Sequence, residues 1–212
     1  MDCLTLTFDK PAEAWIEALP LGNGSMGAMS YGRFENEKIE LNLDTLWSGN
    51  GRNKENKNRN IDWKFLQKQI FDGNYQEAEN YCKENVLGDW TESYLPAGNL
   101  CIDVKTPELE GSGTYNRQLS LKEAIERVDY CQEHQHYQRE LFVSMTEPVM
   151  AVHYHVGENC KIEMTLALES EIQHQCTSFA NCGIIMEGQA PIYTNVTKLR
   201  LIKRLLYYSK IV

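Results

Sequence analysis

Apolar and polar residues alternate along much of this chain, with the two-residue period of β-strands. The first run places Leu4, Leu6 and Phe8 between polar residues, and residues 39–43 repeat the pattern. Further strands are predicted at 101–104 and at about 115–121, 125–132, 136–145, 148–156, 160–168 and 183–188. Short strands at such regular spacing are typical of a sandwich or barrel of antiparallel sheets. The pattern therefore predicts a mainly β protein.

One segment has the helical period instead. Its apolar residues at helical spacing are Ile61, Phe65, Leu66 and Ile70. The pattern stops at Gly73, and Asn74 with Glu77 predicts a capping box that opens a second helix. The predicted inward face of the second helix consists of Tyr75, Ala78, Tyr81, Cys82 and Val86. We expect this two-helix unit, about residues 61–86, to be an insertion between strands, preceded by an exposed loop at 50–60.

Three glycines near the amino terminus imitate a nucleotide-binding motif. Gly22, Gly24 and Gly27 have the G-x-G-x-x-G spacing, and Asp44 follows at the distance of a ribose-binding acid. That motif requires a strand before the glycines and a helix after them. Here the following residues have the pattern strand, turn, strand, with the turn predicted at 35–37. We therefore interpret the glycines as positions of tight turning or close backbone approach.

Composition narrows the classes of partner. The chain has 212 residues and a formal net charge of −9, which disfavours nucleic acids and anionic membrane surfaces. No apolar run has the length of a membrane helix, and no secretory signal is evident, so the sequence predicts a cytoplasmic protein. Seven scattered cysteines without a C-x-x-C pair indicate reduced thiols rather than a disulfide framework.

Six segments in a fixed order carry a family resemblance. They are WIEALPLGNGSMGAM (15–29), LNLDTLWSG (41–49), YLPAGNL (94–100), YNRQLSL (115–121), YQRELFVSMTEPVMAVHY (137–154) and MEGQAP (186–191). Together they resemble the amino-terminal domain of glycoside hydrolase family 95, the inverting α-L-fucosidases. The chain departs from the family pattern at Ser25, where arginine is usual, and at Leu43, where glutamate is usual. The match covers about residues 10 to 192.

The resemblance implies an antiparallel β-sandwich, a super-sandwich, over residues 1–192. It also implies that the catalytic acid and base lie in an (α/α) barrel after the sandwich, so no catalytic residue is expected in this chain. The tail 193–212 departs from the pattern and is rich in basic residues, so we expect it to arise from truncation or a frameshift, the alternative being a basic terminal strand or helix. The expected partners are a fucosylated glycan and the missing barrel. A surface that normally packs on a barrel is expected to promote self-association.

The candidate ligand-binding residues lie within the second motif, LNLDTLWSG. They are Asn42, Asp44, Thr45 and Trp47. An indole face stacks on sugars, and Asn and Asp hydrogen-bond vicinal hydroxyls, so this loop could line the substrate entrance. The competing interpretation makes Trp47 a core or interdomain anchor and Asp44 a turn residue. Two other functions stay open: a stand-alone carbohydrate-binding module that uses Trp47 or Trp90, and a structural remnant without a ligand.

Charged residues elsewhere predict no second site. Glu35, Glu37 and Glu40 are expected on a solvated strand face or in a turn. Arg139 and Glu140 point to opposite sheet faces and are expected to form separate cross-strand ion pairs.

Four histidines raise the question of a metal. His134 with His136, and His153 with His155, are spaced so that each pair shares one strand face. Zinc needs their convergence together with supporting partners. Because glutamines and a tyrosine surround the first pair at a predicted hairpin, we expect solvent exposure. Neither a metal nor another cofactor is expected.

Overall fold

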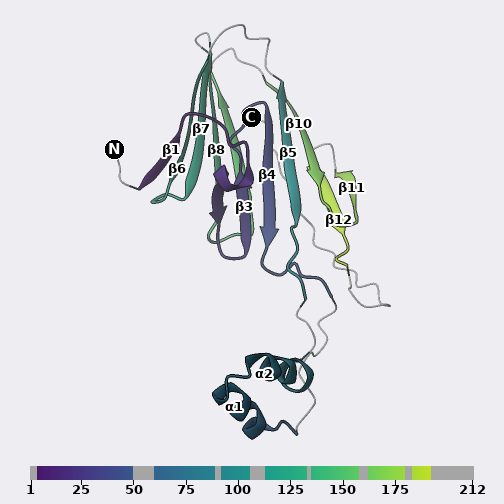
Figure 1. Cartoon of the computed structure of the whole chain (residues 1–212). Coiled ribbons are helices and arrows are strands. Elements are labelled where there is room, and N and C mark those ends of the chain that lie inside the picture. The colour runs from purple at the N-terminus through teal and green to yellow at the C-terminus, as the bar shows by residue number, and fades with distance from the viewer. Residues whose placement is uncertain are drawn as a thin grey trace.

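Antiparallel strands form two five-stranded sheets that face one another in the part of the chain that the computed structural model describes (Figure 1). The described residues are 4–49, 60–88, 92–105, 113–132, 135–157, 162–179 and 183–191. The first sheet contains, in spatial order, β1 (Thr5–Phe8), β6 (Thr114–Ser120), β7 (Ile125–Gln132), β8 (Gln135–Val143) and β9 (Met150–Val156). The second contains β10 (Glu163–Glu169), β5 (Gly98–Lys105), β4 (Asn36–Leu43), β3 (Met26–Ser30) and β2 (Leu19–Gly22).

A separate hairpin completes the β structure. Strands β11 (His174–Phe179) and β12 (Gly183–Gly188) pair with each other, and β12 contacts β10 at the edge of the second sheet. Met186 of β12 is buried and joins the main core. The mainly β, antiparallel sandwich expected from the sequence is therefore confirmed.

Two strands escaped the sequence prediction for different reasons. Strand β2 contains Pro20, which usually argues against a strand. It occupies the edge of its sheet, where a missing N–H is tolerated, and Pro20 is exposed there. Strand β11 reads HQCTSF and lacks a strong apolar alternation.

The predictions for 50–59, for Trp90 and for the tail 193–212 concern residues outside the described ranges.

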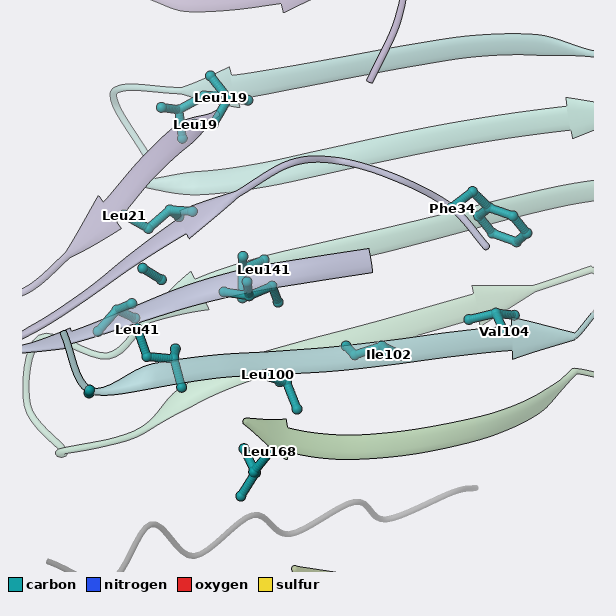
Figure 2. Packing of buried hydrophobic residues seen from close by; sticks show 14 of the residues in the cluster. Leu19, Leu21, Phe34, Leu41, Leu100, Ile102, Val104, Leu119, Leu141 and Leu168 are labelled. Carbon is teal, nitrogen blue, oxygen red and sulfur yellow. The ribbon is translucent and has the colours of Figure 1, made fainter. Parts of the chain in front are cut away.

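The main core lies between the facing sheets. Side chains from both sheets meet there (Figure 2), including those of Leu21, Leu41, Leu100, Ile102, Leu119 and Leu141. Alternate residues of each strand contribute, as the burial pattern of β5 shows. At one end of the core, Phe34 stacks on Tyr130 with ring centroids 4.9 Å apart. The alternation in the sequence therefore identified the buried face correctly.

The helical insertion lies between β4 and β5, as predicted, and stands apart from the sheets (Figure 1). It consists of α1 (Trp63–Phe71), α2 (Tyr75–Tyr81) and a π-helical turn, η2 (Cys82–Val86). A single 3-10 turn, η1 (Trp15–Glu17), precedes β2. Across the described residues, none of the helices has the length and apolar character of a membrane span.

Two details of the helical prediction are wrong. The expected capping box is absent: Asn74 occupies the N-cap of α2, but its side-chain Nδ2 donates to Gln69 Oε1 at 2.9 Å instead of the side chain capping the helix. Tyr75 does not face inward, because its side chain is largely exposed. The side chain that does cap a helix is Asp62, whose Oδ1 accepts from the Phe65 N–H at 2.9 Å at the start of α1.

A buried ion cluster, formed by Ser30, Glu37, Glu126 and Arg139, joins the two sheets. Arg139 of β8 lies with Nη1 2.8 Å from Glu37 Oε2 of β4 in the opposite sheet. Its Nη2 lies 2.9 Å from Glu126 Oε2 of the neighbouring strand β7 and donates to Ser30 Oγ at 2.9 Å. All four residues are at most 2% exposed. The expectation that Glu37 lies in a turn or on a solvated face is therefore wrong.

Backbone donors complete the surroundings of Glu37. Its Oε1 accepts hydrogen bonds from the N–H groups of Tyr31 at 3.0 Å and Gly32 at 3.3 Å. Burial raises the pKa of Glu37, although Arg139 opposes that effect. Burial alone would lower the pKa of Arg139, but the carboxylates of Glu37 and Glu126 hold it well above its usual value. The turn before β4 ends earlier than predicted, because β4 already begins at Asn36.

Gly32, next to the ion cluster, allows the side chain of Arg117 to pack closely against the backbone. Its φ of +71° lies in the left-handed region, and an added Cβ would stand 2.2 Å from Cδ of the buried Arg117. Arg117 in turn donates through Nη1 to the backbone oxygen of Glu17 at 3.0 Å and lies over the ring of Phe8. Only glycine satisfies both the conformation and the space at position 32.

Replacing Arg139 by methionine tests the ion cluster. The change leaves two carboxylates buried without their cation, so we expect a loss of about 3–5 kcal/mol in the free energy of unfolding. Urea denaturation at neutral pH measures it. Adding Glu37→Leu and Glu126→Leu to Arg139→Met removes the unpaired charges and should recover most of the loss. A loss below about 1 kcal/mol, the range of exposed pairs, would contradict a sealed cluster.

Candidate functional site

The candidate loop begins where β4 ends. Asn42 is exposed on β4 and lies opposite Gly27 of β3. Asp44 and Thr45 form an exposed turn closed by the hydrogen bond from Leu46 N to Leu43 O at 3.1 Å. All four predicted residues, Asn42, Asp44, Thr45 and Trp47, are exposed at the end of the sandwich next to this turn.

Asp44 attaches this turn to the preceding hairpin. Its N–H donates to Ser25 O at 2.9 Å, and its Oδ1 accepts from Ser25 Oγ at 3.3 Å. The β2–β3 turn is itself organised by Asn23, whose Oδ1 accepts from the Ser25 and Met26 N–H groups. Asn23 Nδ2 also donates to Ser144 O of the β8–β9 turn at 2.7 Å. The glycine motif thus forms a hairpin turn, in agreement with the prediction that these glycines allow tight turning and do not bind a nucleotide.

Trp47 is held by its edge and leaves much of its ring in solvent. Its Nε1 donates to Asp44 O at 2.8 Å. Its ring meets Tyr94 edge-on, with centroids 5.0 Å apart and an interplanar angle of 61°. Trp47 is 45% exposed and Tyr94 44% exposed. Trp47 is therefore no core residue, and it is available as a sugar-stacking ring or as an interdomain anchor.

A short backbone pairing beneath the aromatic pair fixes the loop. Trp47 forms an isolated antiparallel bridge with Tyr94. The buried Ser48 donates from its N–H to Ser93 O at 2.8 Å and from Oγ to Glu92 Oε2 at 3.1 Å, and it accepts from Ser93 N. Gly49, with φ of +86°, lies against the Glu92 carboxylate, where an added Cβ would clash. The motifs LNLDTLWSG and YLPAGNL thus pair with each other.

Sequence reasoning missed Tyr94, Ser48 and Glu92 as parts of this site. Tyr94 begins one of the family-like motifs, but its contact with Trp47 spans a helical insertion and leaves no local periodic signal. A pairing between two motifs could be inferred only from the family resemblance. The site therefore consists of two chain segments, whereas the sequence suggested one.

The carboxylates near the loop do not form a reacting pair. Glu40 binds Lys38 Nζ and the Tyr31 hydroxyl, both at 2.8 Å. Burial acts to raise the pKa of Glu40, but these two partners outweigh it and lower the pKa. Glu37 and Glu126, which both bind Arg139, are buried inside the ion cluster and cannot meet a substrate from solvent. Glu123 and Glu140 both form ion pairs with Arg127, away from this loop on the first sheet.

The remaining charged candidates, Glu140 and Arg139, lie on opposite faces of the first sheet. Glu140 accepts from Arg127 Nε at 2.7 Å, which confirms the predicted cross-strand ion pair. Arg139 also pairs across strands, with Glu126, but its second partner belongs to the opposite sheet.

His153 and His155 share the exposed face of β9, with ring centroids 6.5 Å apart, as their spacing predicts. His136 is exposed and lies 3.4 Å from Asp129, while His134 falls outside the described residues. In the described ranges, no three His, Cys, Asp or Glu side chains gather as a metal centre would require.

Comparison with known proteins defines the class of this molecule. The family model "Glycosyl hydrolase family 65, N-terminal domain" matches residues 6–204, nearly the whole chain. The chain therefore belongs to this family of glycosyl hydrolase amino-terminal domains.

Two relatives carry the name of fucosidases. The chain is 26% identical to alpha-L-fucosidase 2 of Arabidopsis thaliana over 87% of its own length and 22% of the relative. It is 29% identical to probable alpha-fucosidase A of Aspergillus niger over 73% of its length and 20% of that protein. The predicted resemblance to a family 95-like fucosidase amino-terminal domain is confirmed. The chain spans about a fifth of the length of these curated relatives.

A double-mutant cycle tests the aromatic pair. Trp47→Ala and Tyr94→Ala should each lower the free energy of unfolding, and the cycle should give a coupling energy of about 0.5–1.5 kcal/mol, as edge-to-face aromatic pairs do. Urea denaturation of the wild type, both single variants and the double variant measures it. Additive single effects would show that the rings do not stabilise each other.

Proposed function

We propose that this chain is the non-catalytic amino-terminal domain of an inverting α-L-fucosidase-like glycoside hydrolase. Its role in such an enzyme is to brace the catalytic domain and shape the substrate entrance. The observation that carries the proposal is the match of residues 6–204 to a glycosyl hydrolase amino-terminal domain, in a chain that covers about a fifth of its fucosidase relatives.

The chemistry of inversion supports a division of labour between domains. One carboxylic acid protonates the leaving oxygen and a base activates water on the opposite face, with the carboxyl groups about 6.5–9.5 Å apart. Both groups must reach the substrate. Glu37 and Glu126 are buried around Arg139. Glu123 and Glu140 are both held in ion pairs by Arg127. We infer that the acid and base of such an enzyme come from the part of the polypeptide outside this domain.

The loop of Asn42, Asp44, Thr45 and Trp47 is the proposed contribution to the substrate entrance. The exposed indole of Trp47 offers a flat apolar surface for a sugar ring, and Asp44 and Asn42 offer polar groups beside it. Because the Ser48 hydrogen bonds and Tyr94 hold the loop, it meets a ligand without a large ordering cost. The proposed ligand is a fucosylated glycan.

The chain alone should release no fucose. Incubation with a 2′-fucosylated oligosaccharide, followed by chromatography of the products, tests this expectation, with the full-length Arabidopsis relative run in parallel under the same conditions. The physical reason is that inversion needs an acid and a base on opposite faces of the substrate, and the carboxylate pairs around Arg139 and Arg127 are held in ion pairs with these arginines. Measurable turnover by the pure chain would overthrow the proposal that its machinery lies elsewhere.

The second candidate function is a stand-alone carbohydrate-binding module, which the half-exposed ring of Trp47 favours. Titration with fucosyllactose to millimolar concentration, followed by tryptophan fluorescence, tests it. A module should show a saturable change that Trp47→Ala abolishes and that Trp15→Ala, which removes another exposed tryptophan, preserves. An unchanged fluorescence spectrum would exclude the carbohydrate-binding module. The remaining functions would then be the bracing role and a structural remnant without a ligand.

A further inference from the structure

We propose that an exposed apolar stripe on α1, formed by Trp63 and Ile70, is the surface through which the helical insertion docks on the catalytic domain of a longer glycoside hydrolase polypeptide. The inference rests on the proposed function and adds to it the surface that makes the contact. Trp63 is 55% exposed and Ile70 is 46% exposed.

The helical geometry separates this stripe from the internal contacts of the insertion. Trp63 and Ile70 are seven residues apart, so they lie on nearly the same side of α1, two turns from each other. Leu66 lies about a sixth of a turn to one side and is buried. Phe71, Lys64 and Lys68 lie away from the stripe, about 80–140° around the helix axis from Trp63, and all three are exposed. Helix α1 therefore has one covered apolar row and, beside it, one uncovered row.

The insertion has too small a core to be stable through its own contacts. Its helices have nine and seven residues, below the roughly 12–15 residues at which isolated helices become even marginal. The buried side chains of the two helices are Leu66 and Ala78, supported by the contact between Phe65 and Tyr81.

The sheets do not supply the missing support. The larger contacts of α1 and α2 are with each other and with η2, and the helices stand apart from the sandwich (Figure 1). The insertion thus combines a very small core with two large apolar side chains that are half exposed, and a partner that covers them supplies the missing support.

The size of the stripe indicates a partner on the same polypeptide. The exposed parts of its two side chains amount to roughly 200 Å², about a quarter of the 800 Å² that each partner contributes to a stable complex of separate chains. A tethered partner needs less area, because tethering gives it a high effective concentration. The fucosidase relatives are about five times longer than the matched region, so the rest of the same polypeptide is the proposed source of that partner. The insertion also leaves the sandwich between Trp47 and Tyr94, at the candidate entrance.

Hydrogen exchange tests the proposal. Peptides covering 63–81 are compared between this chain alone and a full-length chimera in which it replaces the matching region of the Arabidopsis relative. Docking should slow exchange in the chimera by about tenfold or more. The double variant Trp63→Ser/Ile70→Ser should restore the fast exchange of the isolated chain. The matched control Lys64→Ser/Lys68→Ser, away from the stripe on the same helix, should keep the slow exchange.

The outcomes separate the two proposals. A chimera that hydrolyses the fucosylated substrate while its helices exchange as fast as in the isolated chain overturns the docking surface and leaves the proposed function intact. A folded chimera with slow helix exchange and no hydrolysis supports the docking surface and contradicts the proposed function. Should the chimera fail to fold, the segment aligned with 63–81 is measured in the unmodified Arabidopsis protein, where fast exchange again overturns the docking surface.

Self-association of the isolated chain gives a second readout. Sedimentation of the isolated chain and of both double variants shows whether a second copy covers the stripe. Dimers that disappear in Trp63→Ser/Ile70→Ser, together with an unprotected stripe in the chimera, would assign the stripe to a second copy and overturn the proposal.

Discussion

The guanidinium of Arg139 fixes how the two sheets sit on each other. Leucines of the core hold the sheets together, but apolar contacts have little direction and tolerate small shifts. The ion cluster adds an ion pair between Arg139 and Glu37 of the opposite sheet, and a hydrogen-bonded ion pair between Arg139 and Glu126 of the neighbouring strand. In a dry interior an unpaired charge is costly, so both carboxylates have to stay beside the guanidinium. We infer that these bonds select the relative position that the apolar core alone leaves free.

The candidate loop depends on that position. Asn23 in the second sheet donates to Ser144 in the turn between β8 and β9 of the first sheet. The same β2–β3 turn holds Asp44 through Ser25. The end of the sandwich that presents Trp47 is therefore connected to both sheets, and its geometry follows from the way they are joined. The insertion that carries the proposed docking stripe follows β4 directly after the candidate loop in the chain.

Local patterns predicted most strands, because each buried strand carries its own alternation of side chains. They failed where burial depends on another part of the chain. Glu37 looks like a surface residue in its sequence context, and only Arg139 from a distant strand explains its burial. The pairing of Trp47 with Tyr94 is likewise non-local. Strand β2 was not predicted although it contains Pro20 at a permitted position. Proline is tolerated there because β2 lies at the edge of its sheet, and the edge position is a property of the whole sheet.

The separation of the cluster partners in sequence bears on synthesis. Ser30 and Arg139 are 109 positions apart. At about 5–20 residues per second, a ribosome takes roughly 5–20 s to travel between them. During that interval the early strands β2, β3 and β4 have emerged with an acidic group on the face destined for the interior, and the arginine that neutralises it has not yet been made. Completion of the amino-terminal half thus waits for the carboxyl-terminal half, and the nascent chain depends on water, or on a chaperone, to shield that face.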